Sequence, residues 1–264
     1  MNHQVLSITN EEFSYVQKLL KSVTGISLSV QKKNLVTSRM ARRLSELGFE
    51  DFTSYISYMS KHKDEIQLFV DKMTTNETYF LREEVHFEFL KNFLIANPQK
   101  TLRIWSCASS NGAEAYTISI FLKEHSKLTH RILASDISEA ILEIAMEGVY
   151  LEEDLRKIPA NLKLKYFSRD KENWYVHESV KESVTFKNIN LMDEEYPLKS
   201  PMDIIFCRNV MIYFDEHTRE ELLLKIYHNL NPGGLLFLGL SESMANPLYF
   251  TALGNSIFQK KAGR

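Results

Sequence analysis

The amino-acid sequence predicts an α/β protein in which an all-helical N-terminal domain precedes a Rossmann-like domain with a small antiparallel β insertion. Three observations lead to this prediction. Residues up to about 74 show only helical periodicity, and from about Leu102 short apolar runs alternate with amphipathic helices. The first apolar run also ends in a loop of small residues, as at the strand ends of an open parallel sheet.

The first 74 residues are predicted to form four short helices. Thr9 and Glu12 match a capping box at the start of the first helix, and Gly25 is a stop signal at its end. Apolar residues between them recur at helical spacing, which predicts one buried face. The other three predicted helices span Gln31–Leu47, which ends at Gly48, then Asp51–Ser60 and Asp64–Met73.

The region after Leu102 is predicted to be a parallel sheet covered by helices, because strands that alternate with helices need crossover connections. A final hairpin is predicted from Tyr249–Leu253 and Ser256–Lys260. Between Tyr150 and Asn190 the alternation lapses, and Trp174–Val176 with Val184–Phe186 predict a small antiparallel insertion over about residues 160–188. The predicted strands are Leu102–Ser106, Arg131–Ser135, Met202–Cys207 and Gly234–Leu240, and the predicted helices are Ala113–Lys123, Glu139–Glu147 and Glu216–Asn229.

The loop after the first predicted strand and the acid after the second predict a nucleoside site. The chain turns at Asn111-Gly112 into a helix, and the second strand ends on Asp136, whose carboxylate can accept hydrogen bonds from ribose hydroxyls. Neither G-x-G-x-x-G nor G-x-x-x-x-G-K-[ST] occurs, so a phosphate cradle is poorly supported. An adenosine ligand without phosphate fits better, and S-adenosylmethionine is the common one. The alternative for Asp136 is an ordinary helix N-cap, a place that Ser138 can also take.

Composition and charge limit the function classes. The 264 residues carry a formal net charge of −2, which argues against a dedicated nucleic-acid binder. The two cysteines, Cys107 and Cys207, are expected to be reduced and buried. No signal peptide and no apolar run of membrane-spanning length occurs, so we expect a cytoplasmic protein that does not insert into a membrane. The eight histidines show no metal-ligand spacing, and we expect no metal.

Several motifs in one order carry a resemblance that covers nearly the whole chain. MTTNETYFLRE (residues 73–83) is followed by WSCASSNGAEAY (105–116), ASDIS (134–138), NL (190–191), IFCRNVMIYF (205–214) and GLSES (239–243). The series closely resembles the CheR family, the bacterial chemotaxis-receptor glutamate O-methyltransferases. The resemblance implies a receptor-docking helical domain over residues 1–74, a linker over 75–90 that contributes to the cofactor site, and a methyltransferase domain over 91–264.

The resemblance implies that the chain binds S-adenosylmethionine, releases S-adenosylhomocysteine and methylates the cytoplasmic helices of chemotaxis receptors, and we expect a monomer. The family's contacts carry over by position to the following residues: Asn76, Thr78 and Arg82 in the linker, Glu114 at the ligand, Asp136 at the ribose, Asn190 and Leu191 about the adenine, Arg208 and Asn209 at the methionine half, and Tyr213 near the methyl-transfer centre.

The chain departs from the family pattern at two places. The usual S-T-G-E-E-P-Y loop is here Ser110 to Tyr116 (SNGAEAY), which lacks the first glutamate and the proline but keeps Glu114. We therefore expect cofactor binding to be retained, with altered strength. Between Phe167 and Trp174 the chain lacks the longer, glycine-containing turn of family members that tether to a receptor's C-terminal pentapeptide. This difference argues against pentapeptide tethering.

The implied chemistry needs no catalytic base, because a glutamate carboxylate is already ionised at neutral pH. The enzyme has to align carboxylate oxygen, methyl carbon and sulfur, and such positioning supplies on the order of 7–11 kcal/mol of a barrier. We hypothesise that Arg82 aims the incoming carboxylate through its fork of donors and that Tyr213 donates a hydroxyl hydrogen bond.

The second predicted helix supplies a docking hypothesis. Five basic residues occur there before the first acid, Glu46: Lys32, Lys33, Arg39, Arg42 and Arg43. Lys32, Arg39 and Arg43 share one helical face, and the family implies that this face docks onto an acidic receptor helix. The alternative is an ordinary solvated basic face.

Two other functions are open at this point. One is a methyltransferase that acts on nucleic acid or a small molecule, but the [DNS]-P-P-[YFW] motif of amino-group methyltransferases is absent. The other is an inactive cofactor-binding sensor or scaffold, which the altered loop suggests. Retention of Arg82, Glu114, Asp136, Asn209 and Tyr213 argues against it.

Overall fold

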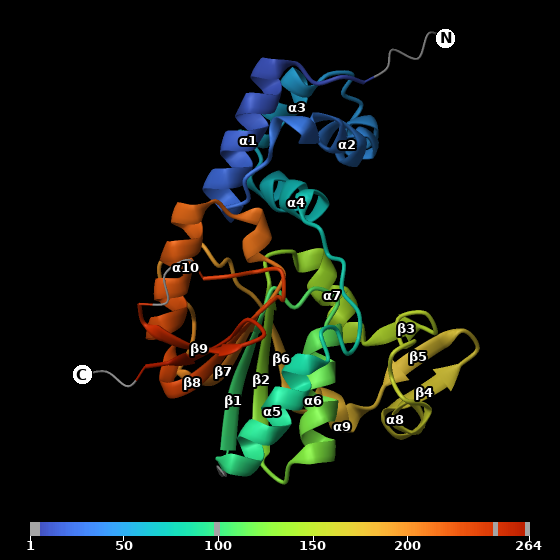
Figure 1. The fold of residues 1–264 in the computed structure, drawn as a ribbon. Coiled ribbons are helices and arrows are strands. Elements are labelled where there is room, and N and C mark those ends of the chain that lie inside the picture. The colour runs from blue at the N-terminus through green and yellow to red at the C-terminus, as the bar shows by residue number, and fades with distance from the viewer. Residues whose placement is uncertain (1–5, 98–100, 245–247, 262–264) are drawn as a thin grey trace.

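The computed structural model describes residues 6–97, 101–244 and 248–261 (Figure 1). Its N-terminal part consists of helices α1 (Asn10–Thr24), α2 (Lys33–Leu47), α3 (Phe52–Met59) and α4 (Lys63–Met73), with one 3₁₀ turn, η1 (Val30–Lys32), before α2. The predicted capping box is confirmed, because the Thr9 hydroxyl accepts from the Glu12 N–H and the Glu12 carboxylate accepts from the Thr9 N–H. Gly25 ends α1 with a φ of 77°, a left-handed conformation that favours glycine.

The four helices enclose a core of their own. Each helix has an apolar face, and the buried residues of these faces form one cluster: Phe13, Val16 and Leu20 from α1, Val36, Met40 and Leu44 from α2, Phe52, Tyr55 and Met59 from α3, and Phe69 and Met73 from α4. The sequence prediction of four helices is confirmed to within two residues at each boundary.

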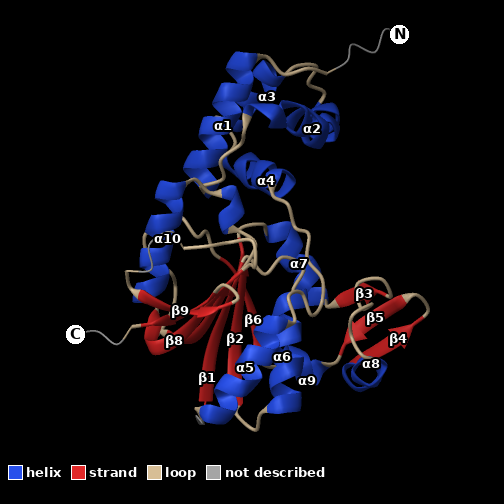
Figure 2. Ribbon diagram, in the orientation of Figure 1, coloured by secondary structure: helices blue, strands red, loops and turns tan. Residues whose placement is uncertain are grey.

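The C-terminal part is built on a seven-stranded sheet with the order β6-β2-β1-β7-β8-β10-β9 (Figure 2). The first five strands in that order are parallel, and the last two form the predicted antiparallel hairpin at the edge. The strands are β1 (Thr101–Cys107), β2 (Thr129–Asp136), β6 (Val184–Asn188), β7 (Met202–Cys207), β8 (Leu230–Leu238), β9 (Phe250–Gly254) and β10 (Ile257–Lys260).

Helices cover both faces of this sheet. Residues of β1 alternate between the two faces, with Leu102 and Ile104 packing in the cluster that α5 (Val85–Ala96) and α6 (Ala113–His125) cover. Trp105 and Cys107 pack in the cluster on the other face, under α10 (Glu216–His228). Helix α7 (Glu139–Glu147) follows β2 at the edge that β6 forms. Both cysteines are free and buried, as predicted.

A second, three-stranded antiparallel sheet stands beside the main sheet (Figure 1). It consists of β3 (Val149–Leu151), β5 (Asn173–Val176) and β4 (Phe167–Asp170), with α8 (Ala160–Tyr166) packed on it. The predicted partner strand Val184–Phe186 is wrong, because this segment belongs to β6 and pairs in parallel with β2. The last element before β6 is α9 (Glu178–Lys181), a single turn that is too short to show helical periodicity.

Two further features differ from the sequence prediction. Helix α5 was not predicted, although Phe87, Leu90 and Leu94 are buried at helical spacing. The predicted start of the fourth strand at Gly234 is wrong, because β8 already begins at Leu230. The register between β7 and β8 shifts there, so this segment forms an irregularity within the strand.

The helical part is fixed above the carboxyl ends of the parallel strands. The Ser27 N–H donates to the Tyr213 carbonyl over 2.8 Å, and Ile26 forms a β-bridge with Phe214. The Asn190 amide donates to the Val23 carbonyl over 2.6 Å. These contacts hold the end of α1 against the loops that follow the strands. No helix in the described ranges is long and apolar enough to cross a membrane.

Candidate active site

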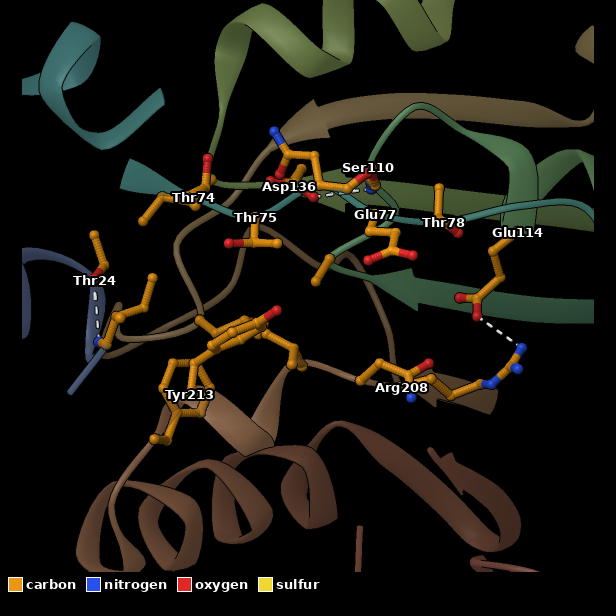
Figure 3. A pocket seen from close by; sticks show the side chains of 18 of the residues that line it. Thr24, Thr74, Thr75, Glu77, Thr78, Ser110, Glu114, Asp136, Arg208 and Tyr213 are labelled. Carbon is orange, nitrogen blue, oxygen red and sulfur yellow. Dashed lines mark hydrogen bonds and ion pairs between the residues drawn. The ribbon is translucent and has the colours of Figure 1, made fainter. Parts of the chain in front are cut away.

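A cavity opens where the order of the parallel strands reverses, beside the carboxyl ends of β1 and β7, which is where ligands bind in open α/β sheets. It encloses about 840 Å³ of space free of protein atoms, including its open mouth. Its walls come from three parts of the chain: the end of α1, the linker after α4, and the loops after the strands (Figure 3). The helical part therefore completes a cavity that the sheet alone would leave open.

The structure brings together every predicted cofactor-binding and catalytic residue. All of them line this cavity: Asn76, Thr78, Arg82, Glu114, Asp136, Asn190, Leu191, Arg208, Asn209 and Tyr213. The sequence analysis missed further lining residues, among them Thr24, Ile26, Thr74, Thr75, Glu77 and Ser110. Thr24 and Ile26 lie at the end of a helix far away in sequence, and only the stop signal at Gly25 marked this place.

Asp136 lies at the end of β2 and fixes the loop after β1. One carboxylate oxygen accepts from the Ser110 N–H over 2.9 Å, and the other accepts from the Ser138 N–H over 3.0 Å. The cap of α7 is Ser138, whose hydroxyl accepts from the Ile141 N–H, so Asp136 is not the N-cap. Burial raises the pKa of Asp136. Each of its oxygens keeps a lone pair for a diol in the cavity.

A buried ion cluster forms the opposite wall of the cavity. The Arg208 guanidinium, whose side chain is 2% exposed, donates to the Glu114 carboxylate over 2.9 Å and to the Glu83 carboxylate over 3.0 Å. Glu114 also accepts from the Ser106 hydroxyl over 2.6 Å. Burial raises the pKa of Glu114, although Arg208 acts in the opposite direction. Burial acts to raise the pKa of Glu83 as well. The Arg208 charge, with hydrogen bonds from the Asn209 amide and the Leu240 N–H, nevertheless holds the pKa of this carboxyl below its usual value.

Glu83 and Glu242, which the sequence analysis did not single out, hold the loops after β7 and β8 in place. Asn209 sits in the left-handed region with a φ of 56°, and its side-chain amide donates to Glu83 over 3.2 Å. Its backbone N–H donates to the Glu242 carboxylate over 2.8 Å, and the same carboxylate accepts from the Gly239 and Ile212 N–H groups. The motifs around residues 83 and 242 gave the only signal of this support.

The rest of the wall is apolar and faces the sheet loops. Ile137, Ile189 and Leu191 line it together with Val210 and Phe214. Leu191 is 7% exposed and packs in the core cluster under α10, so this wall is rigidly supported. Such a surface suits a flat heteroaromatic ring.

The donor set fits S-adenosylmethionine. The Asp136 carboxylate suits a ribose diol, the apolar wall suits adenine, and the charged groups Glu114, Arg82 and Arg208 complement the ammonium and carboxylate of an amino-acid zwitterion. Among the residues that the structure describes, no group of His, Cys, Asp and Glu side chains could hold a metal ion.

The predicted docking residues have different surroundings. Arg39 donates to the Met73 and Thr74 carbonyls over 2.5 and 3.0 Å and to the Thr75 hydroxyl over 2.9 Å. The Arg43 guanidinium pairs with Glu65, which is 3% exposed. Both guanidinium groups are thus already engaged inside the chain.

The other three docking residues are accessible. Arg42 is 86% exposed, and among the described residues its one ion pair is with Glu46, one helical turn away. Lys32, in η1, is exposed, and the half-buried Lys33 donates through its ammonium to the Asn10 side chain. Positive charge accessible to a partner therefore comes from Lys32, Lys33 and Arg42.

Comparison with known proteins identifies the family. The family model described as the CheR methyltransferase SAM binding domain matches residues 76–258, and the model of the CheR methyltransferase all-alpha domain matches residues 11–74. The chain belongs to the CheR methyltransferase family. S-adenosylmethionine is therefore its cofactor, and the two matched regions meet at the linker that lines the cavity.

Proteins similar to this chain over most of its length occur in several bacteria. The chemotaxis protein methyltransferase of Borreliella burgdorferi is 42% identical over 90% of this chain and 90% of its own length. Chemotaxis protein methyltransferase 2 of Pseudomonas aeruginosa is 38% identical, covering 97% of this chain and 95% of that protein. The chemotaxis protein methyltransferase of Escherichia coli is 34% identical, covering 96% and 92%.

Proposed function

We propose that this chain transfers a methyl group from S-adenosylmethionine to glutamate side chains of chemotaxis receptors, giving glutamate methyl esters and S-adenosylhomocysteine. The observation that carries the proposal is the convergence of Asp136, Glu114, Arg208 and Tyr213 on one cavity, in a chain whose CheR relatives are chemotaxis methyltransferases. We also propose that the enzyme works as a monomer in the cytoplasm, where the methylated segments of such receptors lie.

The residues that hold the cofactor follow from the donor set. Asp136 binds the ribose, Asn190 and Leu191 border the adenine, and Glu114 receives the ammonium of the methionine half. Asn76 and Thr78 from the linker, with Arg208 and Asn209 from the end of β7, close the site around that half. When bound, S-adenosylmethionine supplies an electrophilic methyl group on its sulfonium.

The chain itself positions the acceptor and excludes water. Arg82 lines the cavity. Within the described parts of the chain its only side-chain hydrogen bond goes to the Glu77 carbonyl, so most of its donors are free for an incoming carboxylate. Tyr213 lines the same cavity and is held through its backbone by Ser27. Because the acceptor is already an anion, neither residue has to remove a proton; they orient the carboxylate for attack.

Docking of the receptor is assigned to the accessible basic residues of η1 and α2. Lys32, Lys33 and Arg42 attract an acidic helix and speed its encounter with the enzyme. The small sheet contributes no tether in this proposal. Its β4–β5 turn consists only of Lys171 and Glu172, between the paired residues Asp170 and Asn173.

The test is an incubation with methyl-labelled S-adenosylmethionine and membranes that bear chemoreceptors of the organism encoding the chain. We expect base-labile label on receptor glutamates, because carboxylate methyl esters hydrolyse in mild base. Label that resists base would assign another acceptor group, and absence of label from an enzyme that binds S-adenosylhomocysteine would indicate a sensor without turnover. Arg82→Ala should lower the rate by orders of magnitude while leaving the melting temperature nearly unchanged.

A further inference from the structure

Three cations crowd around one aromatic ring at the side of the cavity. The Tyr79 ring has the Lys157 ammonium 4.8 Å from its centroid, and the guanidinium carbons of Arg82 and Arg156 each lie 5.7 Å from it. Cations are attracted to the face of an aromatic ring within about 6 Å, which explains how one ring gathers three like charges. Tyr79, Arg82, Arg156 and Lys157 are called the Tyr79 cluster below.

The cluster joins two separate parts of the fold. Tyr79 and Arg82 belong to the linker, whereas Arg156 and Lys157 lie in the loop between β3 and α8 of the small sheet. In Figure 1 the linker descends past α7 on the side where the small sheet stands. Arg82 also lines the cavity, so the cluster continues from the site of methyl transfer onto the surface.

The cations of the cluster form no direct ion pair with the described residues. In the described parts of the chain, no carboxylate lies within ion-pair distance of Arg82, Arg156 or Lys157. The side chains of Arg156 and Lys157 are exposed and donate no hydrogen bond that the structure records. The nearest acid in the linker, Glu77, lines the cavity and accepts from Arg82 only through its backbone carbonyl.

A surface of this kind recruits anions. Three like charges at a partly desolvated ring repel one another, and an incoming carboxylate relieves that repulsion while keeping the contacts with the ring. The protein as a whole carries a net charge of −2, and Glu153 and Asp154 stand in the same loop, so the three cations are grouped at the ring and are not part of a general basic surface.

We propose that the Tyr79 cluster is a second docking site for the protein substrate, and that Arg156 and Lys157 bind acidic side chains flanking the glutamate that is methylated. The inference rests on the proposed function and adds a specificity element to it, because a glutamate with further acids beside it is preferred over an isolated one. The site lies on the linker and the β3–α8 loop, apart from the basic face of α2.

The test compares two charge reversals that change the formal charge equally. Arg156→Glu/Lys157→Glu reverses the two exposed charges of the cluster. Lys123→Glu/Lys127→Glu reverses two exposed lysines, one in the last turn of α6 and one just before β2, at the amino ends of the parallel strands and so away from the carboxyl ends that border the cavity. Initial rates are measured against chemoreceptor-bearing membranes that the unsubstituted enzyme methylates, at a series of salt concentrations. Binding of S-adenosylhomocysteine is measured by calorimetry for each variant.

We expect Arg156→Glu/Lys157→Glu to lower kcat/KM by about tenfold or more, mainly through KM, because charge steering accelerates association by 10-fold to 10³-fold. The difference from the unsubstituted enzyme should shrink as salt rises, and affinity for S-adenosylhomocysteine should stay unchanged. Lys123→Glu/Lys127→Glu should match the unsubstituted enzyme. If the reversal impairs folding, Arg156→Ala/Lys157→Ala gives the same comparison with less perturbation.

If the two reversals have equal kcat/KM values and the unsubstituted enzyme methylates receptors, the Tyr79 cluster is not a docking site, but the proposed function still holds. A reversal that weakens S-adenosylhomocysteine binding would also overturn it, since the cluster would then support the cofactor. If the unsubstituted enzyme places no base-labile label on receptors, the proposed function and the cluster fall together.

Discussion

At the scale of single residues, Asp136 has a double task that can be separated by mutation. It orders the loop after β1 through Ser110, and it is proposed to bind the ribose. Asp136→Ala should weaken S-adenosylhomocysteine binding about ten- to a hundredfold, because hydrogen bonds to a charged group contribute roughly 1.5–3 kcal/mol. Ser138→Ala is the control: it removes the cap of α7, which costs about 1 kcal/mol of stability, and should leave affinity nearly unchanged in calorimetry.

Glu114 gives cofactor binding a pH dependence. Burial raises the pKa of Glu114, so the unliganded fold takes up a proton at a higher pH than the unfolded chain does. The stability that this uptake contributes is fully present below the unfolded pKa and is lost as pH rises through the folded pKa. A ligand ammonium favours the charged carboxylate instead. Affinity for S-adenosylhomocysteine should therefore fall as pH drops through the raised pKa.

The matching variant for this prediction is Glu114→Gln. The affinity of this variant for S-adenosylhomocysteine should be lower at neutral pH and should vary less with pH. Burial also raises the pKa of Asp136, so Asp136 still contributes a fall in affinity at acidic pH. Calorimetric titrations from neutral to acidic pH measure both slopes. Identical slopes in the two proteins would show that the ammonium does not lie at Glu114.

At the scale of the elements, the arginines of α2 show how a charge pattern can have two meanings. From the sequence, Arg39 and Arg43 share a face with Lys32, and all three suit docking. The structure places Arg39 against the linker carbonyls and Arg43 against Glu65. A one-dimensional pattern gives the face of a helix but not what covers that face, and here α4 and the linker cover part of it.

Arg39 should accordingly affect the cofactor site. Arg39→Met removes charged donors from the Thr74 carbonyl and the Thr75 hydroxyl, and both threonines line the cavity. We expect a loss of about 1.5–3 kcal/mol in stability together with weaker S-adenosylhomocysteine binding. Arg42→Met, at an exposed site whose pair contributes little, should change neither by more than about 0.5 kcal/mol. Thermal melts measure the stability of both variants, and calorimetry measures their affinity for S-adenosylhomocysteine. Equal stability and equal affinity in the two variants would contradict a role for Arg39 at the linker.

The elements also show what the sequence can predict about this fold. Caps, glycine stops and apolar periodicity located α1 to α4, β1, β2 and β7, because these signals are local. The pairing of β6 with β2 is a long-range choice, and the single turn of α9 left no periodic signal for the crossover. The motifs located the cavity residues on the sheet, but not Thr24 and Ile26, whose role depends on how α1 is placed above the strands.

At the scale of the whole molecule, the cavity joins the two parts of the chain through their mutual packing. Thr24 and Ile26 line it from α1, and the bridge from Ile26 to Phe214 fixes their position. Ligand binding should therefore stabilise the helical part as well as the sheet. At a ligand concentration of 100 times Kd, the stabilisation is about 2.7 kcal/mol for a protein that binds only when folded. Calorimetric scans should show both parts shifting upward together with S-adenosylhomocysteine, and a shift of one part alone would contradict this coupling.

A substitution at Gly25 tests the same packing between the helical part and the sheet loops without a ligand. Its φ is +77°, and a Cβ added there would lie 2.5 Å from the Met192 sulfur, so Gly25→Ala combines backbone strain with crowding between α1 and the loop after β6. Gly48 has a φ of +71° and nothing within 4 Å of such a Cβ. Both alanine variants should lose about 1–2 kcal/mol of stability from the left-handed backbone. Only Gly25→Ala should also weaken S-adenosylhomocysteine binding, because the ligand must then restore the packing between α1 and the loop after β6. Each 1.4 kcal/mol that this restoration costs lowers the affinity about tenfold. Equal affinities in the two variants would mean that the helical part covers the cavity without shaping it.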